Sequence, residues 1–271
     1  MQRVAIVTGG TRGIGRAISL AFLRGGTHVA ATYVANEEEA ASLGEAAADL
    51  PGELLAIRAD AGSGPDAASV VERVLSSWGR VDFLVNNAAV SWFAFLDEMT
   101  EEFLDETIRV NLKGPVLMTQ AVLASMKRQR FGRIVNASSI SGHYADVGQV
   151  AYGSTKAGVE MLTKLAAAEL GPYGITVNAY APGIIETDMT RGMIEDRGDV
   201  QLRQIPAGAF GSPDDVAGLV MYLCSEAGGY ITGEIIGVDG GMLRAQNPSR
   251  AIDRAQAESH SADDTIHNLP G

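Results

Sequence analysis

The fold is decided by the stretch Thr8-Gly9-Gly10-Thr11-Arg12-Gly13-Ile14-Gly15 near the start of the chain. It follows a short apolar run at residues 3–8 and opens an amphipathic run at residues 16–24. Glycines let the backbone turn sharply and approach a ligand closely, and a helix N-terminus offers free N–H groups and the positive end of a dipole. The stretch therefore predicts a phosphate-binding turn between a strand and a helix. Its spacing differs from the G-x-G-x-x-G fingerprint, and it lacks the Gly-Lys-Ser/Thr of a Walker A loop.

Beyond this turn, short strand-like runs alternate with helical ones. Most of the candidate strands are continuous apolar runs, which is typical of parallel strands covered on both faces. The segments between them are rich in alanine, leucine and glutamate, which fits crossover helices. We therefore predict an α/β protein with a single-domain, Rossmann-type doubly wound fold, in which helices flank a seven-stranded parallel sheet. The candidate strands are residues 3–8, 28–33, 54–59, 81–85, 133–137, 176–180 and 234–238.

Two segments stand apart from this alternation. Residues 184–206 form a long excursion rich in Met, Asp and Arg, and a segment of this length is typically functional. It precedes a helix opened by Ser212 and Pro213, which suit an N-cap and the first helical position. Residues 245–271 are polar, so we predict a domain at 1–244 followed by a poorly ordered tail.

Composition and charge exclude several classes of function. The 271 residues carry a formal net charge of −12, which disfavours general nucleic-acid binding. One cysteine excludes a disulfide framework, and the four histidines form no His-x-x-x-His pair, so we expect no metal site. No run of about 18 apolar residues exists, so we expect no membrane span. A cytoplasmic enzyme is the expectation.

Tyr152 and Lys156 lie four residues apart at the start of a helical run, which places both on one helix face. A free tyrosine has a pKa of about 10 and is a poor acid at neutral pH, but a nearby ammonium stabilises the phenolate and lowers that pKa. Tyr152 can then protonate the alkoxide formed when a hydride reaches a ketone. Ser138 and Ser139 follow a candidate strand, and either hydroxyl can donate to the substrate carbonyl.

A further candidate, Asn111, lies in a helix predicted over residues 101–130, four residues before Pro115. Because proline has no N–H, the carbonyl of Asn111 loses its helical partner. We therefore expect the helix to kink there and the freed carbonyl to be able to hold a water.

These features together resemble the short-chain dehydrogenase/reductase family over roughly residues 3–243, with details similar to its 3-oxoacyl-acyl-carrier-protein reductases. The markers recur in order as Thr8-Gly9-x-x-x-Gly13-x-Gly15, Asp60, Asn86-Asn87-Ala88, Asn111, Ser139, Tyr152-x-x-x-Lys156, Pro182-Gly183 and Thr187. The resemblance assigns catalytic roles to Asn111, Ser139, Tyr152 and Lys156, and it selects Ser139 over Ser138. It also implies that a proton reaches Tyr152 from solvent through a water on the Asn111 carbonyl, Lys156 and the cofactor ribose.

The resemblance implies a nicotinamide cofactor, and the residues favour NADP(H). An NAD site uses a carboxylate at the end of the second strand to bind the ribose 2′-OH, whereas by resemblance Tyr33 occupies that position here. Arg12 lies in the phosphate turn, where a cation can meet a 2′-phosphate that a carboxylate would repel. Alternatively, Arg12 is a solvated surface cation and Asp60 only caps a helix.

The full set of residues expected to contact the cofactor lies at five strand ends and on the helix that carries Tyr152 and Lys156. Among them, Ala89 stands where the family usually has glycine, which puts the local backbone near the nicotinamide in question. The set is Thr8, Gly9, Thr11, Arg12, Gly13, Ile14, Gly15, Tyr33, Asp60, Ala61, Asn87, Ala88, Ala89, Tyr152, Lys156, Pro182, Gly183, Ile185 and Thr187.

A substrate pocket is expected from three loops, whose aromatic and methionine side chains suit an apolar, elongated ketone. The alternative is that most of these side chains only pack. The expected lining is Ser91, Trp92, His143, Tyr144, Gln149, Ile184, Met189 and Met193.

Lys127, Arg128 and Arg130 form a cationic cluster that could dock an acidic acyl-carrier protein. Tyr173 stands where related enzymes of fatty-acid synthesis often have a second docking arginine, which weakens this hypothesis. Alternatively, the cations complement the C-terminal end of a helix dipole.

Three functions remain open. The favoured one is an NADPH-dependent ketoreductase that converts a 3-oxoacyl group, carried by an acyl-carrier protein in fatty-acid or polyketide synthesis, to the 3-hydroxyacyl product, with Tyr152 as general acid. The second is a reductase or dehydrogenase of small free ketones or secondary alcohols. The third is a non-catalytic nucleotide-binding subunit of a mixed oligomer. The resemblance also implies a homotetramer.

Overall fold

The computed structural model describes residues 2–255 of the chain. A seven-stranded parallel sheet lies at its centre, with the strand order β3-β2-β1-β4-β5-β6-β7. This topology confirms the predicted doubly wound fold, and its order reverses between β1 and β4, where such sheets bind ligands. The strands are β1 (Val4–Val7), β2 (His28–Tyr33), β3 (Leu54–Arg58), β4 (Phe83–Asn86), β5 (Gly132–Ala137), β6 (Ile175–Pro182) and β7 (Ile235–Val238).

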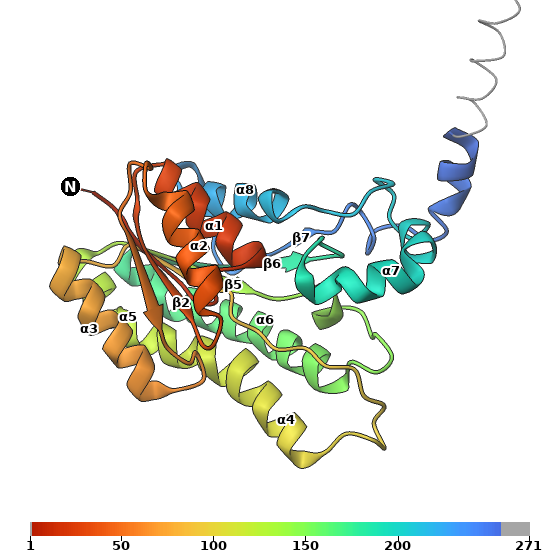
Figure 1. Cartoon of the computed structure of the whole chain (residues 1–271), viewed down its shortest axis with the longest axis horizontal. Helices are drawn as coiled ribbons and strands as arrows, with labels where there is room; N and C mark the ends of the chain where they lie inside the picture. Colours follow the sequence, from red (N-terminus) through yellow and green to blue (C-terminus); the bar gives the residue numbers. More distant parts are fainter. Residues whose placement is uncertain (1, 256–271) are drawn as a thin grey trace, which may run out of the picture.

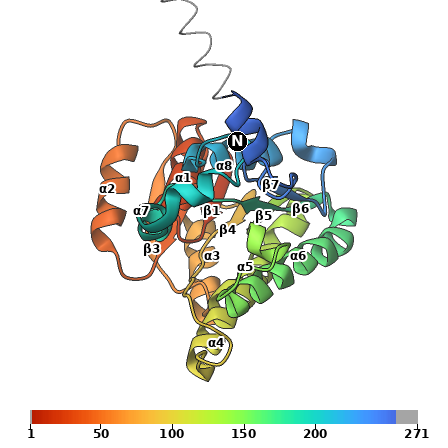
Figure 2. The ribbon, with the colours of Figure 1, turned by 90° about the vertical axis from the view of Figure 1, so that its right-hand side faces the viewer.

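Helices cover both faces of the sheet (Figures 1 and 2). One face packs against α1 (Gly13–Arg24), α2 (Glu37–Ala47) and α8 (Pro213–Cys224). The other packs against α3 (Gly64–Trp78), α5 (Gly114–Gln129) and α6 (Val150–Leu170). In β1, Ala5 and Val7 belong to the first core and Val4 and Ile6 to the second. This alternation explains the continuous apolar runs, because every side chain of such a strand is buried on one face or the other.

The helix predicted over residues 101–130 is divided in three. It consists of α4 (Glu101–Ile108), a π-helical turn η1 (Arg109–Lys113), and α5. In this turn the N–H of Gly114 donates to the carbonyl of Arg109, five residues earlier. The expected kink around Asn111 therefore takes the form of a π-helical turn, a feature that is frequent at functional sites.

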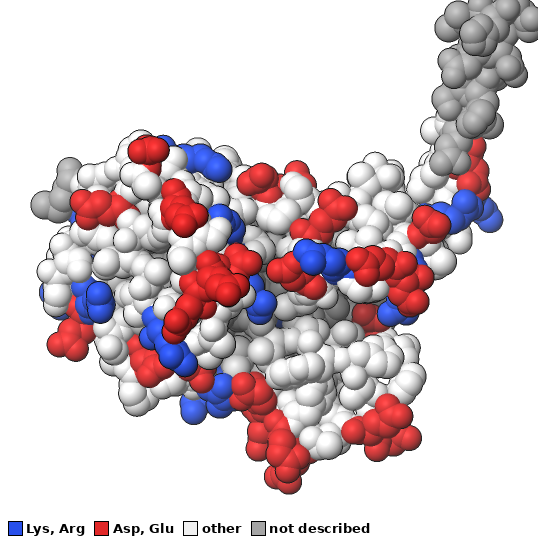
Figure 3. All heavy atoms as spheres, in the orientation of Figure 1, with Lys and Arg blue, Asp and Glu red and all other residues white. Residues whose placement is uncertain are grey.

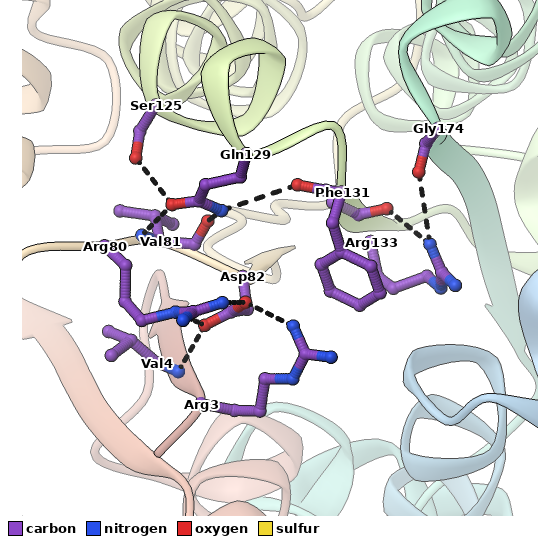
Figure 4. Close-up of polar contacts among 11 residues, drawn as sticks. Arg3, Val4, Arg80, Val81, Asp82, Ser125, Gln129, Phe131, Arg133 and Gly174 are labelled. Carbon is purple, nitrogen blue, oxygen red and sulfur yellow. Dashed lines mark hydrogen bonds and ion pairs between the residues drawn. The ribbon is translucent and has the colours of Figure 1, made fainter. Parts of the chain in front are cut away.

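At the edge of the sheet where the strands begin, the buried carboxylate of Asp82 joins the start of β4 to the start of β1 (Figure 4). Asp82 accepts hydrogen bonds from Arg3 at 2.7 Å, from Arg80 at 2.6 Å and from the backbone N–H of Val4 at 3.0 Å. Beside it, the Gln129 amide donates to the Val81 carbonyl at 2.8 Å. The C-terminal end of α5 is therefore fixed at the edge where the strands begin.

The predicted excursion contains the helix α7 (Asp188–Leu202), which is interrupted by a non-helical backbone at Arg197. After it, the predicted N-cap Ser212 begins α8 with a capping box. The expected tail is described only as far as residue 255. Residues 249–255 are helical there and lie near α7 (Figure 1), where Arg203 pairs with Asp253 at 3.1 Å. Residues 256–271 lie outside the described residues. Between residues 2 and 255, no helix has both the length and the apolarity needed to cross a bilayer.

Candidate active site

Three of the predicted catalytic residues converge where β5 ends against the first turns of α6. Ser139 follows β5, and its side chain lies close enough to the phenol of Tyr152 to lower the pKa of that phenol. Lys156 is fully buried, its Nζ donates to the Ala137 carbonyl at 2.7 Å, and it lies 5.3 Å from the centroid of the Tyr152 ring. The structure therefore places two hydroxyls and an amine together at the carboxyl edge of the sheet.

The pKa values of this group differ from the sequence-based expectation. Burial raises the pKa of Tyr152 above its ordinary 10.0, and the nearby Ser139 side chain only partly opposes this. Burial also lowers the pKa of Lys156 from 10.5 to about 8. The expectation that Lys156 lowers the pKa of Tyr152 is wrong, because desolvation dominates and the ammonium of Lys156 bonds to the Ala137 carbonyl. Tyr152 therefore stays protonated at neutral pH, which is the form a general acid needs.

The fourth residue, Asn111, lies in the π-helical turn and is buried. Its amide exchanges two hydrogen bonds with the backbone of Val90, both at 2.8 Å, and donates a longer one of 3.4 Å to the hydroxyl of Thr155. The side chain thus joins the segment after β4 to the helix turn that carries Lys156. The side chain of Asn111 is occupied by these hydrogen bonds. A water at Asn111 would therefore bind its backbone carbonyl, to which Pro115 has no N–H to donate.

The phosphate turn has the conformation that its glycines predict. Gly9 and Gly13 have φ of +61° and +51°, in the region that favours glycine. A Cβ at Gly15 would collide with the carbonyl oxygen of Gly9. The turn is held by Thr8, whose hydroxyl accepts from the backbone N–H groups of Asn87 and Ala88, each at 3.0 Å. This backbone is therefore preformed for close approach by a phosphate ahead of the α1 N-terminus.

The surroundings of the turn fit a dinucleotide. Arg12 is exposed at the N-cap of α1, and within residues 2–255 no ion pair is recorded for it. Tyr33, partly exposed, ends β2 where a carboxylate would otherwise stand. A Cβ on Gly13 would lie 3.5 Å from the Thr187 methyl, so the segment after β6 also reaches the turn. Predicted cofactor residues from the turn after β1, the end of β2 and the segment after β6 thus lie together.

The match that decides the family covers nearly the whole chain: residues 9–243 match the family described as "Enoyl-(Acyl carrier protein) reductase". The chain belongs to the short-chain dehydrogenase/reductase family. It is 43% identical to a Staphylococcus epidermidis protein named 3-oxoacyl-acyl-carrier-protein reductase FabG, over 242 residues that make up 89% of this chain and 99% of that protein. A Thermotoga maritima protein of the same name is 42% identical over 241 residues, covering 89% and 98%. Among solved structures, gox2181 superposes with a TM-score of 0.84 at 34% identity, covering 89% of this chain and 96% of that one.

Membership of the short-chain dehydrogenase/reductase family implies a nicotinamide cofactor, but two of the predicted cofactor residues have other partners. The Asn87 amide donates to the carbonyls of Thr8 and Gly9 and accepts from the Tyr180 hydroxyl at 2.9 Å. The Asp60 carboxylate bonds the N–H of Gly62 at 2.8 Å and Arg109 at 2.7 Å. Asn87 therefore shapes the phosphate turn. The alternative that Asp60 caps α3 is wrong, because Ser63 occupies that position.

The remaining cofactor positions show no strain. Within residues 2–255, the non-glycine residues with positive φ are Arg130 and Asn247, so Ala89 does not adopt a left-handed conformation. Gly183 approaches the backbone of Asp239 so closely that a Cβ would lie 2.8 Å from its Cα.

The predicted pocket residues fall into separate groups. The Ser91 hydroxyl donates to the Gln149 side chain at 3.3 Å, and Trp92 packs edge-on against Phe103. Met189 is exposed on α7, Met193 is partly buried there, and Ile184 is buried after β6. His143 and Tyr144 line a cavity of about 280 Å³ beyond Ser139. Its lining is His143, Tyr144, Ala181, Ile235, Gly237, Asp239, Leu243 and Arg244.

The predicted docking cations lie far from this site. Lys127, Arg128 and Arg130 are at the end of α5, next to the start of β5, whereas Ser139 follows its end. The six residues of β5 put about 20 Å between the two edges. Lys127 and Arg130 stack on Tyr173, at 4.4 and 5.8 Å from its ring centroid. Within one chain, these cations and the catalytic group face opposite ends of the sheet.

Sequence reasoning missed Tyr180 and Glu160, both buried. Tyr180 bonds Asn87, as described, and nothing in the sequence pattern of its strand indicated that bond. Glu160 follows Lys156 by four residues on the same helix, and this spacing on a catalytic face was the available signal.

Proposed function

We propose that this protein is an NADPH-dependent ketoreductase that reduces a 3-oxoacyl group carried by an acyl-carrier protein. The observation that carries the proposal is the convergence of Ser139, a protonated Tyr152 and a buried Lys156. It is supported by the relatives' name, since they cover nearly all of this chain. Reduction of a ketone needs a proton donor at one oxygen, and the two adjacent hydroxyls provide a donor and a hydrogen-bond partner for it.

The chain's own residues would handle the substrate oxygen and its proton. The Ser139 hydroxyl donates a hydrogen bond to the ketone oxygen, which strengthens as that oxygen becomes an alkoxide. Tyr152 then gives its proton to this oxygen. Lys156, with a pKa of about 8, releases a proton more readily than an ordinary lysine and lies beside the Tyr152 ring. When bound, the nicotinamide supplies the hydride.

The test of this function is a comparison of kcat/KM on four substrates with NADPH: a carrier-bound 3-oxoacyl chain, the same chain as a carrier-free thioester, a small free ketone, and a carrier-bound enoyl chain. We expect the first to be preferred. Preference for the free ketone would support the small-molecule alternative, and preference for the enoyl chain would assign a different reduction. NADPH binding without turnover of any of the four would support the non-catalytic alternative.

For the cofactor, we expect Arg12→Ala to weaken NADPH binding by roughly 10- to 100-fold, the value of a charge-assisted hydrogen bond, and to leave NADH binding nearly unchanged. Tyr33→Asp should shift the preference toward NADH by adding a partner for the 2′-OH and repelling a 2′-phosphate. Dissociation constants from cofactor fluorescence would measure both effects. Arg24→Ala is the matched control, because Arg24 is exposed at the other end of α1. A wild-type protein that prefers NADH would contradict the argument.

We also propose that the docking cations serve the active site of a neighbouring copy in the expected tetramer, since they lie far from the site of their own chain. Acidic side chains are spread widely over the face in Figure 3, so a cationic patch would steer an acidic carrier locally. We expect the double variant Arg128→Glu, Arg130→Glu to raise KM for the carrier-bound substrate alone. The effect should fade as salt shortens the Debye length from about 10 Å at 0.1 M to about 3 Å at 1 M. Equal losses on the carrier-free thioester would instead indicate damage to the helix end.

A further inference from the structure

A buried carboxylate next to the catalytic group has no role in the reaction described above. Glu160 lies one helical turn after Lys156 on α6 and is 7% exposed. Its Oε1 accepts a hydrogen bond from the Ser138 hydroxyl at 2.7 Å, and its Oε2 lies 3.1 Å from Nδ1 of His143. Both oxygens are therefore paired, which a carboxylate needs in order to be buried.

The two partners of Glu160 flank the turn that carries Ser139. Ser138 precedes Ser139, and His143 follows the 3-10 turn η2 (Ile140–Gly142). Within that turn, the Ser139 hydroxyl accepts from the N–H of Ser141 at 3.2 Å, and its carbonyl accepts from Gly142 at 3.0 Å. The position of the Ser139 side chain therefore follows the position of the turn.

The turn lies so close to α6 that a side chain at its end would crowd the Glu160 carboxylate. A Cβ on Gly142 would lie 2.6 Å from Oε1 of Glu160 and 3.0 Å from the Ser138 hydroxyl. One turn earlier on the helix, Lys156 bonds the carbonyl of Ala137. Two successive turns of α6 thus bind two successive residues, Ala137 and Ser138, immediately before Ser139.

We propose that Glu160 is a positioning residue of the active site. Its carboxylate binds both ends of the Ser139 turn, through Ser138 and His143. Because Glu160 and Tyr152 are on the same helix, this contact fixes the Ser139 hydroxyl relative to Tyr152. The kinetic part of this inference rests on the proposed ketoreductase function. The structural part does not, because it concerns the order of the turn in the free protein.

The test compares Glu160→Met, which keeps the side-chain length but whose thioether is only a weak acceptor, with Glu160→Gln, whose amide oxygen can still accept from Ser138. Because a misplacement of about 1 Å can cost about 10²-fold in rate, we expect Glu160→Met to lower kcat by about 10- to 100-fold. Glu160→Gln should recover part of the loss, and the NADPH dissociation constant should stay unchanged. Glu169→Met, an exposed acid on the same helix, is the matched control.

Two further measurements separate positioning from general destabilisation. In a Ser139→Ala background, Glu160→Met should have no further effect on kcat, because the group it positions is gone. Hydrogen exchange of the backbone amides of residues 139–144 should be faster in Glu160→Met and in His143→Ala, whose half-exposed side chain is removed without opening the core.

A Glu160→Met protein with wild-type kcat, or with the same loss in the Ser139→Ala background, would overturn the inference. If the wild-type protein turns over no 3-oxoacyl substrate, the proposed function fails, and the exchange measurement decides the structural part alone. Unchanged exchange in both variants would overturn it, and faster exchange confined to this turn would support it.

Discussion

Replacing Tyr152 with phenylalanine will lower kcat by at least about 10²-fold, the usual lower bound for removing a general acid. The ring keeps its volume and its packing near Lys156, so the loss isolates the hydroxyl. The Ser139 hydroxyl remains and can still donate to the ketone oxygen. Steady-state kinetics with NADPH and a 3-oxoacyl thioester, together with a cofactor titration, would measure the effect.

We expect the Tyr152→Phe protein to bind NADPH normally, so that the change appears in kcat rather than in cofactor affinity. Tyr222→Phe is the matched control, since that tyrosine is 49% exposed on α8. Near-normal turnover in Tyr152→Phe would remove this residue from the mechanism and leave the proton donor unassigned.

Replacing Lys156 with methionine will have two effects, loss of turnover and a change in how stability depends on pH. In the folded chain the pKa of Lys156 is lowered to about 8 from 10.5. Below about pH 8 the amine is protonated in both the folded and the unfolded state, and burial of the charge destabilises the folded one. Between these two pKa values the unfolded state binds a proton that the folded state does not. Wild-type stability should therefore rise with pH relative to the variant.

The relative gain in the free energy of unfolding should be about 3 kcal/mol over the whole window, from 1.36 kcal/mol for each pKa unit. Urea unfolding of both proteins at the same protein concentration, from about pH 7 to about pH 11, would measure it. Methionine cannot make the hydrogen bond that Lys156 donates to the Ala137 carbonyl. Its loss shifts the difference in the free energy of unfolding by a constant and leaves the slope of that difference with pH unaffected. Lys164→Met is the matched control, because Lys164 is exposed on the same helix. A flat difference for Lys156→Met would contradict the lowered pKa.

The sequence predicted the sheet and the placement of Tyr152 and Lys156 on one helix face, because both depend on local regularities. Parallel strands buried on two faces produce apolar runs, and each of the seven predicted runs overlaps a strand. The spacing of Tyr152 and Lys156 fixes their common helix face regardless of the rest of the fold. Ser212 begins its helix because capping depends on only a few neighbouring residues.

What the sequence did not predict depends on tertiary contacts. The pKa of Tyr152 rises because residues distant in sequence exclude water from it. Asn87 and Asp60 could be recognised as polar residues at strand ends, but not as groups already bonded to Tyr180 and Arg109. The cationic cluster was visible as a run of sequence, whereas the edge of the sheet on which it lies depends on the direction of α5.

The hydrogen bonds of the Asn87 amide distinguish two parts of the candidate nucleotide site, one that can be substituted and one that cannot. The Asn87 amide joins the phosphate turn, β4 and, through Tyr180, β6. A substitution there would disturb three strand ends at once, including the segment that continues to Thr187. Arg12 and Tyr33 have no bond to this junction among the described contacts, so we expect substitutions at these two positions to change coenzyme preference without altering the residues at the centre of the site.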